Sequence, residues 1–172
     1  MSASNWEKIK GKKIPSSLEL DPIVHAYLGK KNEILDIGCG PGKISLRLAS
    51  LGHSVWGIDL NGEGIEIAKT FAEEADLEER LEFRVGDATA LPYASEKFDL
   101  VLMQAFLTTV PGPEPRAKAV REAFRVLKPG GSLYISEFGQ SWHLELYRKR
   151  YLRDFPVTKE EGSFLARDPE TG

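Results

Sequence analysis

Hydrophobic and polar residues follow one another along this chain with two different periods, which predicts a succession of strands and helices. Five short segments are continuously apolar or alternate between apolar and polar residues, as strands of a covered sheet do. Between them, apolar residues recur every three or four positions, as on one face of a helix. The predicted strands are residues 33–37, 54–59, 81–85, 98–103 and 132–138.

Residues typical of helix ends bound the intervening segments. Asp21 before Pro22 is a capping carboxylate followed by proline at the first helical position, Asn61 is a second candidate cap, and Gly52 is a stop. Strands that alternate with helices predict a parallel sheet with right-handed crossovers. Helices are predicted from Pro22, over 43–51, after Asn61, after the break at 111–113 and over 142–155. Their expected core-facing residues are Ile23, Val24, Tyr27, Leu28, Ile44, Leu48, Leu51, Ile65, Ala68, Ala72, Ala75, Val120, Ala123, Phe124 and Leu127.

The composition is that of one globular domain. A length of 172 residues with 41% apolar and 28% charged residues provides a core without an interior boundary. A net charge of -3 argues against a broad nucleic-acid-binding face, and no apolar run reaches membrane-spanning length. The one cysteine, Cys39, cannot form an internal disulfide, which favours a cytoplasmic location. We interpret it as a small spacer rather than a reactive thiol.

A glycine-rich turn follows the first predicted strand, in the sequence Asp36-Ile37-Gly38-Cys39-Gly40-Pro41-Gly42. Three glycines in five positions let the backbone turn sharply and a ligand come close, and the next helix points its N–H groups at that ligand. The pattern therefore predicts a site for a small polar ligand at the strand tip. A dinucleotide fingerprint requires glycine where Lys43 stands, which disfavours an oxidoreductase without excluding it.

Carboxylates follow the next two strands. Asp59 ends the second strand, where it can accept the hydroxyls of a ribose or cap the following helix. Asp87, within Gly86-Asp87-Ala88, can accept from an adenine amino group or stabilise a turn. Both interpretations remain open for Asp87.

Five motifs in register resemble those of class I S-adenosylmethionine-dependent methyltransferases, most closely the group called methyltransferase type 11. The resemblance covers about residues 34–138 and implies an α/β fold, a Rossmann-like doubly wound, mainly parallel sheet of order 3-2-1-4-5 with helices on both faces. The motifs are the glycine turn after Asp36, Asp59, Asp87-Ala88, Phe98-Asp99-Leu100-Val101 and Leu127-Lys128-Pro129-Gly130-Gly131.

This resemblance implies S-adenosylmethionine as cofactor and S-adenosylhomocysteine as product. Asp36 would lie near the cofactor's amino group, Asp59 at its ribose, and Asp87 at its adenine amino group. Leu60 would lie along the adenine face, and Gln104 would face the methionine end and the acceptor. The implied cofactor-binding residues are Asp36, Gly38, Cys39, Gly40, Gly42, Asp59, Leu60, Asp87, Ala88 and Gln104.

The chain departs from the family pattern in two places. Many relatives carry a histidine pair where this chain has Thr108-Thr109. The final helix and hairpin strands of the family are absent, so we expect a C-terminally truncated single methyltransferase domain. Its expected parts, within residues 1–172, are an N-terminal helical lid over 1–30, a cofactor-binding core over 31–138, and a C-terminal helix with an incomplete substrate region over 139–172.

Methyl transfer from a sulfonium is an in-line displacement that depends mainly on alignment, so no catalytic residue is fixed. Gln104, Glu137 and His143 are weak candidates on the acceptor side; Glu137 is equally well a partner of a lysine or of the backbone. Trp142, Tyr147 and Tyr151 are more typical of packing than of a substrate clamp, and the cations over 147–153 of a solvated face. No metal is indicated.

We therefore predict an enzyme that methylates a small molecule. The alternatives are a non-catalytic or remnant S-adenosylmethionine-binding protein, a nucleotide-dependent oxidoreductase, and an RNA methyltransferase that uses the basic helix. Nucleic acid is the less favoured partner because of the net charge.

Overall fold

The computed structural model describes residues 19–165. The described residues form two compact units, with the boundary between Glu137 and Phe138. The expected division at 138/139 lies next to this boundary, whereas membership of both parts in one methyltransferase domain stays a prediction. The part of the expected N-terminal lid before residue 19 lies outside the described residues.

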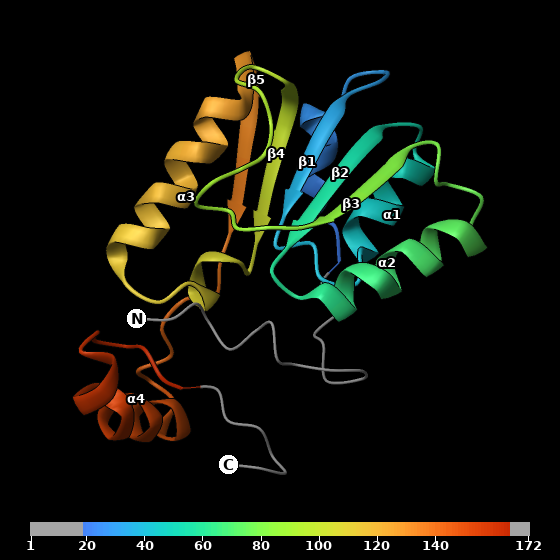
Figure 1. Ribbon diagram of the computed structural model, residues 1–172. Helices are drawn as coiled ribbons and strands as arrows, with labels where there is room; N and C mark the ends of the chain where they lie inside the picture. Colours follow the sequence, from blue (N-terminus) through green and yellow to red (C-terminus); the bar gives the residue numbers. More distant parts are fainter. Residues whose placement is uncertain (1–18, 166–172) are drawn as a thin grey trace. The chain divides into compact units, whose positions relative to one another are not determined.

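The first unit is built on a five-stranded sheet in which every pairing is parallel (Figure 1). The order β3-β2-β1-β4-β5 confirms the predicted topology. The strands are β1 (Glu33–Ile37), β2 (Ser54–Asp59), β3 (Leu81–Val85), β4 (Phe98–Gln104) and β5 (Leu127–Ser136).

Strand β5 begins earlier than predicted, because the segment expected to be a turn belongs to an irregular part of the ladder. Phe98 pairs with Leu127, but Leu100 pairs with Ser132, so the four residues 128–131 of β5 stand opposite the single residue Asp99 of β4. Lys128 within this bulge is anchored to the carboxylates of Glu33 (2.8 Å) and Asp99 (2.9 Å) at the amino end of the sheet. Helix α3 therefore passes directly into β5 at Leu127, and the lysine-proline-glycine-glycine segment lies inside the strand.

Helices cover both faces of the sheet, as the resemblance implies: α1 and α2 lie on one side and α3 on the other (Figure 1). Asp21 and Asn61 are the caps that the sequence predicts, and they accept from the N–H groups of Ile23 (3.0 Å) and Gly64 (2.7 Å). The helices of this unit are η3 (Pro22–Tyr27), α1 (Lys43–Ser50), α2 (Gly62–Glu74), η4 (Leu107–Thr109) and α3 (Pro113–Val126).

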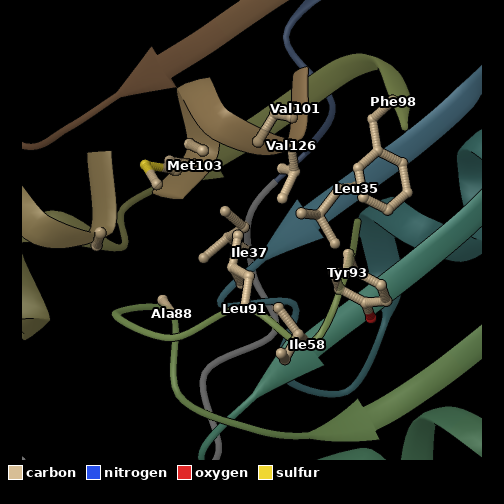
Figure 2. Close-up of a cluster of buried hydrophobic side chains, with 12 residues drawn as sticks. Leu35, Ile37, Ile58, Ala88, Leu91, Tyr93, Phe98, Val101, Met103 and Val126 are labelled. Atoms are coloured by element: carbon tan, nitrogen blue, oxygen red, sulfur yellow. The ribbon is translucent and has the colours of Figure 1, made fainter. Parts of the chain in front are cut away.

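Alternate residues of the central strands face two separate hydrophobic clusters. Leu35 and Val101 point toward α3, within the cluster drawn in Figure 2. Ile34 and Leu100 point to the opposite face and pack against Leu48 of α1. Because both faces of β1 and β4 are buried, these strands are nearly all apolar, which is why the sequence located them so clearly.

Some core-facing predictions are wrong. The segment after Pro22 is a 3-10 helix, and in it Val24 is buried whereas Ile23 (54%) and Tyr27 (53%) are exposed. With three residues per turn, residues four apart do not share a face, so the α-helical stripe does not form. Leu51 and Ala75 are C-caps that lie at the surface, and Phe124 of α3 is 61% exposed. The buried face of α3 is formed instead by Ala119, Ala123 and Val126.

The second unit contains α4 (Glu145–Thr158), which begins three residues later than predicted. Tyr151 is buried against the rings of Trp142 (4.8 Å between centroids) and Phe164 (5.9 Å), and its hydroxyl accepts from the Ser141 N–H. The aromatic residues thus form a small core of their own. Within residues 19–165, no helix combines the length and apolarity needed to cross a bilayer.

Candidate functional site

The loop between β1 and α1 has the backbone that the three glycines predict. Gly38, Gly40 and Gly42 have φ values of 76°, 49° and 79°, all in the left-handed region. The Gly38 N–H donates to the carbonyl of Ile58 (2.8 Å), which ties the loop to the end of β2. The loop is therefore a fixed turn at the carboxyl edge of the sheet, where open α/β folds bind ligands.

Asp59, at the end of β2, is joined to this loop. Its Oδ2 accepts from the Gly40 N–H (2.9 Å) and its Oδ1 from the Asn61 N–H (2.8 Å). Burial raises the pKa of Asp59, although these backbone hydrogen bonds act in the opposite direction. A carboxylate has about four acceptor positions, so each oxygen keeps capacity for a ligand hydroxyl. The carboxylate of Asp59 thus stabilises the backbone, and its predicted binding of a ribose stays a prediction that these hydrogen bonds leave room for.

Asp36 lies deeper than the loop and is only 3% exposed. Its Oδ2 accepts from the hydroxyl of Ser45 on α1 (2.6 Å), a buried partner that sequence reasoning missed. Burial raises the pKa of Asp36 to about 6, the hydrogen bond from Ser45 lowers it in part, and the charge of Asp59 raises it again. The predicted proximity of Asp36 to a ligand's amino group stays a prediction.

Asp87 and Ala88 follow β3 in a turn. Asp87 is exposed; its Oδ1 accepts from the Thr89 N–H (2.8 Å) and its carbonyl from the Ala90 N–H (3.0 Å). Ala88 is buried. One carboxylate oxygen of Asp87 therefore stabilises the turn, and the predicted contact of Asp87 with an adenine amino group stays a prediction.

Gln104 ends β4, and the nitrogen and oxygen of its side-chain amide differ in their hydrogen bonding. Its Nε2 donates to the carbonyl of Glu19 (3.2 Å), whereas its buried Oε1 has no hydrogen-bond partner among the described residues. The Glu19 carboxylate is paired with Lys43 (2.6 Å), which follows the glycine loop. A buried acceptor without a partner indicates a place where a ligand donor fits.

Two further residues, Glu137 and Phe106, complete this edge of the sheet. Glu137, which follows β5, accepts from the N–H groups of Leu107 (2.6 Å) and Thr108 (3.2 Å). Of the two interpretations of this carboxylate, a base or a partner of a lysine or of the backbone, the contacts match the backbone partner. Phe106 lies against the loop: a methyl group at Gly38 would be 2.6 Å from its Cδ2. Sequence reasoning missed Phe106, since an aromatic residue after a strand is not distinctive by itself.

Cys39 and His143 are two further residues that the sequence marked as candidates. Burial, with the charges of Asp36 and Asp59, raises the pKa of the Cys39 thiol far above its usual value, which suits a spacer and not a nucleophile. His143 is exposed and belongs to the second unit, so its role in catalysis stays a prediction. Within residues 19–165, His, Cys, Asp and Glu side chains form no cluster that could hold a metal ion.

The site lies within a region shared with known proteins. A family model described as "Methyltransferase domain" matches residues 35–135. A solved S-adenosylmethionine-dependent methyltransferase from Methanosarcina mazei is 60% identical with a TM-score of 0.84, over 90% of this chain and 75% of that chain.

Curated relatives are more distant. The ubiquinone biosynthesis O-methyltransferase of Coxiella burnetii is 29% identical over 150 residues, which is 84% of this chain and 62% of its own length. The ubiquinone/menaquinone biosynthesis C-methyltransferase UbiE of Roseobacter denitrificans is 33% identical over 142 residues, or 81% of this chain and 55% of its own length. The chain therefore spans 55–62% of the length of these relatives.

Proposed function

The chain belongs to the family of methyltransferase domains, and we propose that it transfers a methyl group from S-adenosylmethionine to a small-molecule acceptor. The observation that carries the proposal is the junction of Asp59 with Gly40, at 2.9 Å. It supports the proposal because it joins a carboxylate with capacity for ribose hydroxyls to a glycine turn at the carboxyl ends of β1 and β2, where open α/β folds bind nucleoside cofactors.

The polar groups of this edge fit S-adenosylmethionine. The Gln104 Oε1, which has no hydrogen-bond partner within residues 19–165, can accept from the cofactor's ammonium group at the end of β4. Asp59 would bind the two ribose hydroxyls through its remaining acceptor positions, and the second carboxylate oxygen of Asp87 would accept from the adenine amino group. Acceptors therefore follow three strands, in keeping with a ligand that carries donor groups along its length.

The cofactor supplies an electrophilic methyl group on a sulfonium with a good leaving group. The protein's task is then to hold donor and acceptor in line and to exclude water. Gln104 is a neutral amide that cannot act as a base, and Glu137 anchors the backbone N–H groups of Leu107 and Thr108. We therefore infer that the described part of this edge contributes mainly by positioning.

The acceptor is proposed as a small molecule because the net charge of -3 does not favour a nucleic acid. Relatives do not fix the acceptor atom, since the Coxiella relative is named an O-methyltransferase and the Roseobacter relative a C-methyltransferase. A cytoplasmic location remains a prediction that depends on the single cysteine, Cys39.

Calorimetric titration with S-adenosylhomocysteine tests the cofactor. We expect binding by the unchanged chain and a loss of about tenfold or more in affinity for Asp59→Ala. Asp99→Ala is the matched control, because that carboxylate also accepts a backbone N–H, from Glu33, but at the amino end of the sheet. Its affinity should remain near that of the unchanged chain. A folded chain that binds no S-adenosylhomocysteine would contradict the proposal.

A second measurement separates catalysis from binding alone. S-adenosylhomocysteine formation is followed with S-adenosylmethionine and a panel of phenols, quinols, thiols and amines. Formation that depends on one acceptor supports methyl transfer. Binding without turnover across the panel favours the non-catalytic alternative, and binding of a nicotinamide dinucleotide in place of S-adenosylhomocysteine favours the oxidoreductase.

A further inference from the structure

We propose that Glu137 is a positioning residue that holds Phe106 against the glycine loop and thereby shapes the cofactor site. The inference rests on the proposed function, since it concerns the same edge of the sheet. It assigns a role to a carboxylate that the sequence marked as a candidate base.

The first step is the contact between Glu137 and the turn after β4. One carboxylate oxygen accepts from the Leu107 N–H at 2.6 Å and the other from the Thr108 N–H at 3.2 Å. These residues begin η4, whose first N–H groups have no partner within so short a helix. Hydrogen bonds to a charged acceptor are stronger than neutral ones, so the side chain fixes the start of this turn.

The carbonyl side of the same turn is fixed as well. Arg116 on α3 donates from Nε to the carbonyls of Leu107 (2.9 Å) and Val110 (2.8 Å). The Thr109 hydroxyl donates to the carbonyl of Phe106 (2.6 Å). Glu137 thus binds the N–H groups and Arg116 the carbonyl groups of one short segment, which restricts the position of Phe106.

The backbone before Phe106 turns its side chain toward the loop. Ala105 has a φ of 50°, an unfavourable left-handed conformation for a residue with a side chain. Its N–H donates to the backbone carbonyl of Ser136 (2.7 Å). Strain of this kind persists only where the surroundings enforce it. The Phe106 ring lies so close to Gly38 that no methyl group fits between them.

The position of Phe106 therefore forms part of the wall beside the first glycine of the loop. If Glu137 is neutralised, η4 loses its charged anchor and Phe106 is free to move. The amide of Glu137→Gln has one oxygen for Leu107, but its NH₂ group faces the Thr108 N–H, donor against donor. The shape of the glycine-loop site then changes without loss of any ligand-binding group.

A double-mutant cycle with S-adenosylhomocysteine as the probe tests this role. We expect Glu137→Gln to weaken calorimetric affinity about fivefold in the unchanged background, and less than about twofold when Phe106→Ala is also present. Glu122→Gln on α3 is the matched control, since Glu122 also accepts a backbone N–H, from Leu91 (2.8 Å), and its loss should leave affinity unchanged. Melting temperatures are recorded for every variant.

The coupling separates a positioning role from a merely structural one. A structural role would lower the melting temperature and the affinity equally in both backgrounds, and that result would overturn the inference. Unchanged affinity in Glu137→Gln would also overturn it, while binding that remains sensitive to Asp59→Ala would leave the proposed function intact. If Glu137→Gln does not fold, Arg116→Lys releases the other edge of the turn, and the same dependence on Phe106 is expected.

Discussion

The hydroxyl of Ser45 donates to the carboxylate of Asp36 at 2.6 Å, and both side chains are buried. This hydrogen bond joins β1 to the first turns of α1 beneath the glycine loop. Two effects act on the pKa of Asp36 in opposite directions. The hydrogen bond from Ser45 stabilises the charged form, whereas burial destabilises that form by more. The resulting pKa of about 6 makes this group sensitive to pH.

We predict that Asp36 makes the folded state less stable as the pH rises from about 4 to about 6. The folded pKa of about 6 lies above the unfolded value of 3.8, so the folded state holds the proton more tightly over this range. The stabilising contribution is complete below the unfolded pKa and is lost as the pH passes the folded one. The whole shift corresponds to about 3 kcal/mol.

Urea unfolding of the unchanged chain and Asp36→Asn, at several pH values between 4 and 7, measures this contribution. The difference between the two unfolding free energies isolates Asp36 from other carboxylates. Asp99, for example, has a pKa that burial raises but its hydrogen bonds from Glu33 and Lys128 lower overall, so its contribution is lost as pH falls. A difference that does not change across this range would show that Asp36 titrates normally.

We predict that Ser45→Ala destabilises the protein by about 1–3 kcal/mol at pH 7.5, because it removes a partner from a buried charged carboxylate. The loss should be smaller at pH 4.5, where Asp36 is protonated. Ser50→Ala is the control on the same helix, since the Ser50 hydroxyl donates to the Arg47 carbonyl at an exposed position. Equal effects of the two substitutions would contradict the prediction; thermal and urea unfolding provide the measurement.

The outline of the fold could be predicted from the sequence because its signals are local. The first three strands have the predicted bounds, since each is a short apolar or alternating run with polar residues beside it. Strand β5 was misplaced because residues 128–131, a turn signal, lie in a bulge whose existence depends on pairing with β4. Pairing across 29 residues, as between Phe98 and Leu127, has no local signature.

In the candidate site, too, residues with a local signal could be predicted, whereas contacts between distant parts of the chain could not. The glycine turn and Asp59 were predictable, because the carboxyl ends of neighbouring parallel strands meet at one edge. The contact of Gln104 with Glu19 joins residues 85 positions apart, and that of Glu137 with Leu107 joins residues 30 apart. Only the three-dimensional structure shows that Phe106 reaches Gly38, because neither residue type indicates the other.

We predict that Asn61→Ala destabilises the protein by about 1 kcal/mol, through loss of the α2 cap. The Asn61 side chain is buried and accepts from the Gly64 N–H at 2.7 Å, so alanine leaves that donor without this partner. Asn61→Ser restores a capping oxygen and should recover most of the stability. Thermal unfolding distinguishes the variants, and a serine variant as unstable as the alanine one would exclude capping as the cause.

The last prediction separates backbone strain from steric overlap in the glycine loop. Gly42 and Gly130 both have φ of 79°, so alanine at either position is strained by about 1–2 kcal/mol. A methyl group at Gly42 would also lie 2.8 Å from Cζ of Phe83 and 2.9 Å from Cβ of Ala68, whereas nothing lies within 4 Å at Gly130. Ala68 is in the middle of α2, so it cannot yield without moving the helix.

We therefore expect Gly42→Ala to destabilise the protein by about 1–3 kcal/mol more than Gly130→Ala, since only the first overpacks a filled space. Urea unfolding of both variants at one pH measures the difference. If both lose the same stability, the loop tolerates the methyl group, and the requirement for glycine at position 42 comes from the backbone alone. A larger loss at Gly42 means instead that Phe83 of β3 and Ala68 of α2 fill the space beside the loop, so that close packing as well as the backbone requires glycine there.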